Sequence, residues 1–476
     1  MNYRLILNYW GLILLYYPAV FALPIFVALY FREDVFAFIY PALISLIVGA
    51  ILFSISKPTS DIAKYREGYA IVGIGWLLVV LIGCLPYIYY GFSPIDAFFE
   101  TMSGFTTTGA TILERVEELP RSLLLWRSLT QWLGGMGIIV LFVAIFPTLA
   151  RKGETLLQAE VPGLKVEKIK PRIRDTALRL YLTYMVLTVV EISLLKLLGM
   201  SLFDAVNHTF TTLSTGGFST HSESIAFFND PRIEFVIFVF MILGGTNFTL
   251  IYFLLKGENK FKNTEFLFYI SVILTTSIIV TVLNLNHFDV IESVRYSFFQ
   301  VASIMTTTGY TTNDFDTWSD AAKILLLILM FIGGSTGSTG GGIKVARIYL
   351  LVQYSISQIL KSADPRTVRI IRFNGEVVSK EVLHNVTAFF VLYILIFVVS
   401  TFIISLFGLD FMTSVSAVAA TLNNVGPGLG SVGASEPYTH LPPAVKIILS
   451  LNMWIGRLEL FTVISLFIPS FWRERW

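Results

Sequence analysis

The sequence contains a single cysteine, Cys84, among 476 residues. One cysteine excludes an intramolecular disulfide and any metal site built from several thiolates. Charged residues are also scarce, at 14% of the chain, whereas an ordinary soluble domain has about 25%. Hydrophobic residues reach 55%, and the mean hydropathy is +0.73. These values exclude an ordinary soluble domain and predict an integral membrane protein.

Several functional patterns are missing as well. The net charge of +2 does not suggest a nucleic-acid partner, and the five histidines form no metalloprotease pattern. The sequence has no recognisable nucleotide-binding fold and no converging Ser/His/Asp set, so an enzyme is only a remote alternative. We therefore expect no organic cofactor in this chain. The lipid bilayer is its first predicted partner.

Apolar stretches recur along the whole chain. Helical stretches of about 20 apolar residues can cross the hydrocarbon of a bilayer. Ten spans are predicted near residues 5–30, 35–56, 69–90, 136–149, 177–198, 233–255, 266–285, 324–332, 383–406 and 445–471. Basic residues gather in alternate loops, near 57–66, 151–174, 256–262 and 344–380, and at 473–475. The positive-inside rule then places both termini in the cytoplasm.

Four polar segments interrupt this apolar sequence at comparable positions. They cover residues 93–111, 202–219, 293–312 and 410–429, and each has an apolar run, then Thr, Ser or Asn, then Gly. Their glycines, Gly109, Gly216, Gly309 and Gly426, lie 107, 93 and 117 residues apart, about two spans plus a hairpin. Irregular backbone at membrane depth is tolerated only where protein buries it or where it lines a water-filled cavity. Four such segments predict one shared cavity.

The residue types of these segments fit a cation filter made of backbone carbonyls. A K⁺ ion enters a narrow pore only if fixed oxygens replace its hydration shell, and the required positive φ angles suit glycine. Each preceding apolar run is predicted to be a short helix whose carboxyl end adds negative partial charge. The alternative is that these sequences are ordinary turns between helices. The predicted filter residues are Thr107, Thr108, Gly109, Ser214, Thr215, Gly216, Thr307, Thr308, Gly309, Asn424, Val425 and Gly426.

A glycine-rich tract occupies residues 333–342 within the apolar region 324–351. Each glycine costs a helix about 1 kcal/mol relative to alanine, so the helix is predicted to break there. A phosphate-binding loop would end in Gly-Lys-Ser/Thr, whereas Lys344 here follows Ile343 and precedes Val345. A flexible gate and a rigid packing kink remain the two interpretations. The glycines of the predicted gate are Gly333, Gly334, Gly337, Gly340, Gly341 and Gly342.

Three further strings give the chain a resemblance to a known family. They are Gln-Trp-Leu-Gly-Gly-Met-Gly at 131–137, the glycine-rich tract with Ile-Lys at 333–344, and Met-Trp-Ile-Gly-Arg at 453–457. With the four segments, they resemble the Trk/Ktr/HKT superfamily of potassium transporters over the whole chain. The extra apolar pair at the N-terminus favours its Trk-type membrane subunit over the shorter Ktr type.

The resemblance implies an all-α integral membrane fold. Four tandem helix/re-entrant pore loop/helix repeats would surround a central pore, with two extra N-terminal transmembrane helices. The implied divisions are an N-terminal helix pair at 1–66, pore repeats at 67–175 and 176–262, a third repeat with the gating loop at 263–380, and a fourth at 381–476.

The resemblance also implies potassium uptake across the bacterial inner membrane, with Rb⁺ as a surrogate ion. Glycine at all four filter positions favours potassium over sodium in this superfamily. The tract 333–342 would then obstruct the pore below the filter, and Arg457 would act as an electrostatic barrier in the pore. A structural ion pair with another repeat is the alternative for Arg457. The alternative function is a proton- or sodium-coupled cation symporter, for which Glu191 is the main candidate carboxylate.

Partners also follow from the resemblance. A Trk-type subunit is expected to form a homodimer and to work with a cytosolic ring of nucleotide-binding, TrkA-type regulatory subunits. The cytoplasmic loop before residue 382 contains Asn374-Gly375 between two β-prone arms, which predicts a tight hairpin. This basic hairpin is interpreted either as part of the docking face for the regulator or as a loop that binds lipid headgroups.

Overall fold

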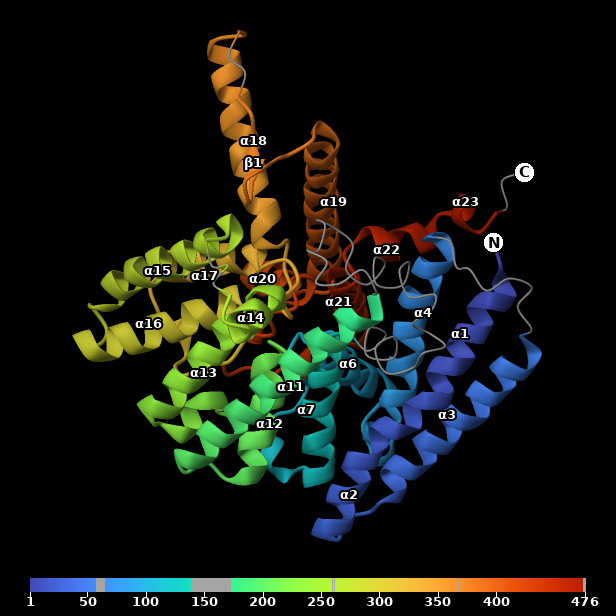
Figure 1. Cartoon of the computed structure of the whole chain (residues 1–476). Helices are drawn as coiled ribbons and strands as arrows, with labels where there is room; N and C mark the ends of the chain where they lie inside the picture. The colour runs from blue at the N-terminus through green and yellow to red at the C-terminus, as the bar shows by residue number, and fades with distance from the viewer. Residues whose placement is uncertain (57–64, 138–172, 259, 261, 367–368, 474–476) are drawn as a thin grey trace.

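The computed structural model describes residues 1–56, 65–137, 173–258, 260, 262–366 and 369–473, and within them the fold is almost entirely helical (Figure 1). The helices of the first part of the chain are α1 (Tyr3–Tyr16), α2 (Ala22–Phe31), α3 (Phe36–Ile55), α4 (Tyr65–Gly83), α5 (Leu85–Tyr89), α6 (Pro94–Phe105), α7 (Arg121–Gly135), α11 (Ile173–Leu197), α12 (Leu202–Leu213), α13 (Pro231–Gly244) and α14 (Phe248–Leu255). They are followed by α15 (Thr264–Asn284), α16 (Val290–Met305), α17 (Asp320–Ile332), α18 (Val345–Ala363), α19 (Lys380–Ser405), α20 (Phe411–Leu422), α21 (Pro443–Arg457), α22 (Phe461–Ile464) and α23 (Pro469–Trp472). This composition confirms the predicted all-α class.

The N-terminal helices α1 and α3 pack along one edge of the molecule (Figure 1). Glycines allow the close approach of the two backbones. A Cβ added at Gly11 would stand 2.6 Å from the backbone nitrogen of Phe53, and one at Gly49 would stand 2.8 Å from that of Leu15. Small residues at the contact are typical of helix pairs in membranes, where close packing replaces the hydrophobic effect between helices.

Eight helices form a closed ring of pairwise contacts in the remainder of the fold. Each of the short helices α6, α12, α16 and α20 packs against the helix that follows it and against one from the preceding part of the ring. The order of contacts around the ring is α6, α7, α12, α13, α16, α17, α20, α21 and α6 again. Outside this ring, the long helices α4, α11, α15 and α19 each pack on one of the short helices.

Six of the ten predicted spans are found as single apolar helices. Among the described residues, six helices are long and apolar enough to cross a membrane by themselves. The stretches predicted as continuous near 233–255 and 445–471 are instead bent helix pairs: α13 and α14 meet at 108°, and α21 meets the helical segment Phe461–Phe467 at 113°. The predicted span at 136–149 lies outside the described residues from position 138 onward, and α17 is a shorter helix that ends at the glycine-rich tract.

Helices α18 and α19 project from the body of the protein (Figure 1). Strands β1 (Arg372–Phe373) and β2 (Glu376–Val377) form an antiparallel hairpin beside them, as the sequence predicts. Asn374 and Gly375 have φ angles of 51° and 84°, the left-handed pair that a tight hairpin turn needs. Phe373 of the hairpin and the flanking Ile371 and Val378 pack against α18 and α19. These contacts stabilise a hairpin that would be only marginally stable in isolation.

Candidate ion-filter site

Four short helices begin at well-capped N-termini. Ser93 Oγ accepts a hydrogen bond from the Asp96 backbone N–H at 3.1 Å, and Ser201 Oγ accepts one from that of Asp204 at 3.0 Å. Asp289 and Asp410 cap α16 and α20 in the same way. Ser and Asp are favoured at this position because their side-chain oxygens satisfy the free N–H groups of the first turn. These capping residues therefore fix where each short helix starts, and Asp289 places the start of α16 at Val290, three residues before the predicted start of the third segment at 293.

The backbone after each short helix repeats one unusual conformation. A non-glycine residue with left-handed φ is followed two positions later by a glycine with positive φ. The pairs are Thr107 and Gly109, Thr215 and Gly217, Thr307 and Gly309, and Asn424 and Gly426, with φ from 54° to 62° for the first member and from 75° to 106° for the glycine. A left-handed L-residue costs about 1–2 kcal/mol, and such strain typically clusters at functional sites.

The hydrogen-bond pattern shows the same register in all four segments. In each pair, the residue between the two members donates its backbone N–H to the carbonyl oxygen of the residue five positions earlier, at 2.8–2.9 Å. These bonds join Thr108 to Ser103, Gly216 to Thr211, Thr308 to Ser303, and Val425 to Ala420. Gly216 is thus equivalent to Thr108, Thr308 and Val425. The prediction that Gly216 takes the positive φ of the second segment was wrong by one position, because Gly217 takes it.

The four glycines with positive φ lie in a closed ring. A Cβ added at Gly109 would stand 2.2 Å from the carbonyl oxygen of Gly216. A Cβ added at Gly217 would stand 1.8 Å from the carbonyl oxygen of Thr308. One at Gly309 would stand 2.0 Å from that of Val425, and one at Gly426 would stand 2.7 Å from that of Thr108. Each segment therefore contacts the next, and the fourth returns to the first. The carbonyl that precedes each positive-φ glycine leaves no room for a side chain on the neighbouring segment.

Side chains behind the ring hold these segments in place. Gln131 of α7 donates through Nε2 to the carbonyl of Gly216 at 2.7 Å, and its Oε1 accepts the N–H of Phe218 at 3.0 Å. The Tyr438 hydroxyl donates to the carbonyl of Gly426 at 2.8 Å. Gln131 belongs to a string that the sequence analysis singled out, yet its role as a support was missed. Its side-chain amide, the only one in α7, was the available signal.

The glycine-rich tract 333–342 lies against the carboxyl ends of three of the short helices. Thr339 Oγ1 lies 2.8 Å from the carbonyl oxygen of Leu213 and 2.9 Å from that of Gly244, and these two acceptors share its one O–H. The N–H of Gly341 donates to Thr307 Oγ1 at 2.7 Å. A Cβ at Gly341 would stand 2.2 Å from the carbonyl oxygen of Asn423. The predicted helix break is confirmed, and the tract contacts the predicted filter residues directly.

Arg457 connects this tract with α7. Its Nη1 donates to the carbonyl of Thr339 at 2.6 Å, and its Nη2 donates to the carbonyls of Gly134, at 2.6 Å, and Gly135, at 2.7 Å. The residue is the last of α21, next to the 113° bend, and not in the middle of a straight span as the sequence suggested. Nearby Glu459 forms an ion pair with Arg347 of α18.

Other polar residues have structural contacts. Asp96 accepts a hydrogen bond from Lys446 Nζ at 2.6 Å, and Glu100 is fully buried against Arg127. Within the described residues, no group of three or more His, Cys, Asp or Glu side chains could hold a metal ion.

The helix ring and its four strained turns define an integral membrane protein of the cation-permeation class, with carbonyl oxygens gathered where the turns meet. The family model described as a TrkH cation transport protein matches residues 35–474. The chain belongs to this TrkH family. Its similarity to transport proteins also confirms the prediction that it is not an enzyme.

Similar proteins match over essentially the full length. The Trk system potassium uptake protein TrkH of Salmonella typhimurium is 40% identical over 486 aligned residues, with 100% of both chains covered. TrkG of Escherichia coli, also named a Trk system potassium uptake protein, is 35% identical and covers 99% of both chains. The crystal structure of the potassium transporter TrkH from Vibrio parahaemolyticus superposes with a TM-score of 0.89 at 36% identity, covering 99% of this chain and 100% of that chain.

Proposed function

We propose that this protein takes up potassium across the bacterial inner membrane through a filter formed by the four turns. The observation that carries this proposal is the closed ring, in which Gly109, Gly217, Gly309 and Gly426 each face a carbonyl of the next segment. Rings of backbone carbonyls replace the hydration shell of K⁺. The carboxyl ends of the four short helices add negative partial charge on the same side. The names of the relatives support K⁺ as the transported ion. Rb⁺ is proposed as its surrogate in transport assays.

Ion flux into liposomes that contain the purified protein tests this function. Uptake of Rb⁺ or K⁺ is compared with uptake of Na⁺, with and without an imposed pH gradient. Selective flux of Rb⁺ or K⁺ down its own gradient, indifferent to pH, is the expected result. If flux occurs without preference for K⁺ or Rb⁺ over Na⁺, the filter assignment is wrong.

Coupled transport is the second candidate function. Glu191 of α11 is fully buried, with Thr212 of α12 beside it. A buried carboxyl next to one of the four short helices is a site where a proton or Na⁺ could bind. Selective Rb⁺ flux that requires a proton or sodium gradient, and loses that requirement in Glu191→Gln, would favour a symporter.

The glycine-rich tract is proposed as the gate. Its contacts with Thr307 and Asn423 put it next to the filter turns, and a segment with six glycines in ten residues can rearrange at low cost. Arg457 holds the tract through Thr339 and adds a positive charge below the filter. Both features would oppose cation passage while the tract stays in this position.

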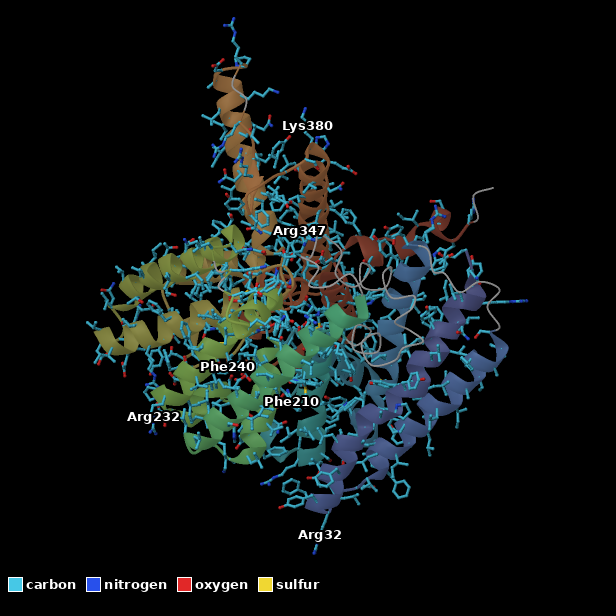
Figure 2. The ribbon with its side chains drawn as sticks, in the orientation of Figure 1. Arg32, Phe210, Arg232, Phe240, Arg347 and Lys380 are labelled. Atoms are coloured by element: carbon cyan, nitrogen blue, oxygen red, sulfur yellow. The ribbon has the colours of Figure 1, made fainter. Side chains whose placement is uncertain are left out.

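The cytosolic partner is proposed to be a ring of TrkA-type nucleotide-binding subunits that docks on the hairpin. Arg372 of β1 and Arg369, three residues before it, are both exposed. Reversing both charges to glutamate should reduce co-purification of a TrkA-type subunit. Arg32→Glu is the matched control, because exposed Arg32 lies at the opposite end of the molecule from Lys380 (Figure 2). Undiminished co-purification of the double variant would contradict the docking assignment.

The chain is also proposed to form a homodimer, with a complete filter in each copy, and to have both termini in the cytoplasm. The mass of the purified protein in detergent tests the dimer, and a monomer mass would refute it. Orientation can be tested by thiol labelling because the one native cysteine, Cys84, is buried. A cysteine at position 380 should react only from the cytoplasmic side, and one at position 32 only from the other side.

A further inference from the structure

A buried ion pair lies behind the first two filter segments. Arg127 of α7 is 2% exposed and Glu100 of α6 is 0% exposed, and the Arg127 Nε donates to Glu100 Oε1 at 2.9 Å. Glu100 is on α6, which ends at Phe105 just before Thr107–Gly109, whereas Arg127 is on α7, which packs against both α6 and α12. The pair is therefore located between the first and second segments.

Glu100 holds the outer end of the first segment. Its Oε2 accepts the backbone N–H of Ile112 at 3.0 Å, and its Oε1 accepts the hydroxyl of Thr111 at 3.0 Å. Thr111 is two residues beyond Gly109, the filter glycine. Because a carboxylate makes strong hydrogen bonds to such donors, Glu100 fixes the path of the backbone as it leaves the ring.

Arg127 extends this connection to the second segment. Its Nη1 donates to the carbonyl of Ser219 at 3.0 Å, and its guanidinium carbon lies 4.2 Å from the centroid of the Phe218 ring. Its Nη2 also reaches Thr111 Oγ1 at 3.2 Å. Ser219 is two residues beyond Gly217, as Thr111 is two beyond Gly109. One guanidinium thus joins equivalent points on two neighbouring segments.

The same helix position carries a polar group in three of the four segments. The shared hydrogen-bond register makes His208 and Gln300 equivalent to Glu100. His208 Nε2 contacts Ser219 Oγ at 3.0 Å, so it supports its own segment as Glu100 supports the first. Among the residues that the structure describes, only the first of these three positions is paired with an arginine side chain. The charged link therefore marks the junction between segments one and two.

We propose that Glu100 and Arg127 act as a brace that sets the spacing of the first two filter segments and thereby contributes to the selectivity for K⁺ over Na⁺. This proposal rests on the proposed function of the four turns as a potassium filter. At this junction Gly109 faces the carbonyl of Gly216, so a shift of one segment relative to the other changes the position of a ring oxygen. The buried guanidinium of Arg127 is held by several hydrogen bonds. It resists that shift because its five N–H donors have a fixed planar geometry.

The test compares the K⁺:Na⁺ flux ratio of the full-length wild type with that of four variants in liposomes. Arg127→Met removes the brace at similar volume, and Arg127→Met with Glu100→Gln removes it without leaving an unpaired carboxylate. Arg127→Lys keeps the charge but cannot make all of the bonds. Arg295→Met is the matched control, because Arg295 of α16 pairs with Glu234 of α13, at 2.5 Å, without contacting a filter turn.

We expect both Met variants to lower the K⁺:Na⁺ ratio about tenfold, the Lys variant to have an intermediate ratio, and Arg295→Met to keep the wild-type ratio. Correct folding is checked by a single symmetric elution peak. If Arg127→Met does not fold, the double variant or the Lys variant decides the question. The brace is refuted if a correctly folded protein with Arg127→Met keeps the wild-type K⁺:Na⁺ ratio, or if Arg295→Met lowers the ratio equally. Either result leaves the filter assignment in place. A wild type without selectivity overturns the filter and the brace together.

Discussion

Replacing Gly109 by serine is expected to weaken the preference for K⁺ over Na⁺. Gly109 has a φ of 83°, and this left-handed conformation costs an L-residue about 1–2 kcal/mol. The new Cβ would stand 2.2 Å from the carbonyl oxygen of Gly216, whereas ordinary contacts begin near 3.4 Å. That oxygen or the backbone of the substituted residue must therefore move by the difference, about 1.2 Å. We expect this displacement to reduce the K⁺:Na⁺ ratio by about tenfold, equivalent to about 1.4 kcal/mol.

The assay measures initial Rb⁺ and Na⁺ fluxes in liposomes for the wild type, Gly109→Ser and Gly91→Ser. Gly91 is the control because its φ of 92° imposes similar backbone strain, while an added Cβ there meets nothing within 4 Å. Gly91→Ser should keep the wild-type ratio. A correctly folded Gly109→Ser with an unchanged ratio would refute the view that this glycine makes room for a filter carbonyl. An equal loss in both variants would assign the effect to backbone strain.

Three further changes test other parts of the site. Gly217→Ala should reduce the K⁺:Na⁺ flux ratio more than Gly216→Ala. The reason is that the new Cβ at position 217 would stand 1.8 Å from the carbonyl oxygen of Thr308, and the φ of Gly217 is 75°. A larger reduction in Gly216→Ala would contradict the revised register. Arg457→Gln should raise Rb⁺ flux without the regulator by at least about tenfold, since the loss of even one of its three charged hydrogen bonds removes about 1.5–3 kcal/mol. Unchanged flux would remove Arg457 from the gate. Thr339→Val should raise the same flux by about fivefold, because it loses the one hydroxyl proton that the carbonyls of Leu213 and Gly244 share, a contribution of about 1 kcal/mol. A decrease would contradict the gate.

Much of the fold could be predicted because its signals are local. Capping residues such as Ser93 and Asp410 mark where short helices begin, six glycines in ten residues stop a helix at 333–342, and Asn374-Gly375 specifies a hairpin turn. Each of these depends on the conformational preference of a few neighbouring residues. Mean hydropathy, by contrast, does not detect short breaks, which is why the bent pairs near 245–247 and 458–460 were predicted as straight spans.

The register of the second filter segment could not be predicted from its local sequence. The second segment reads Ser-Thr-Gly-Gly, and either glycine satisfies the pattern of Thr or Ser followed by Gly. Only the contact with Thr308, 91 residues further along the chain, makes Gly217 the residue with positive φ. The pairing of Glu100 with Arg127 was equally hidden, since charges 27 residues apart have no preferred distance until both helices are packed.

The sequence by itself determined that this protein is a helical membrane protein with four similar polar turns, because composition, hydropathy and glycine content act through the backbone of each segment. The tertiary structure alone decided that the four turns close into one ring, which carbonyl faces which glycine, and which charges lie behind them. These contacts join residues from different parts of the chain, and their geometry exists only when all four short helices are packed together.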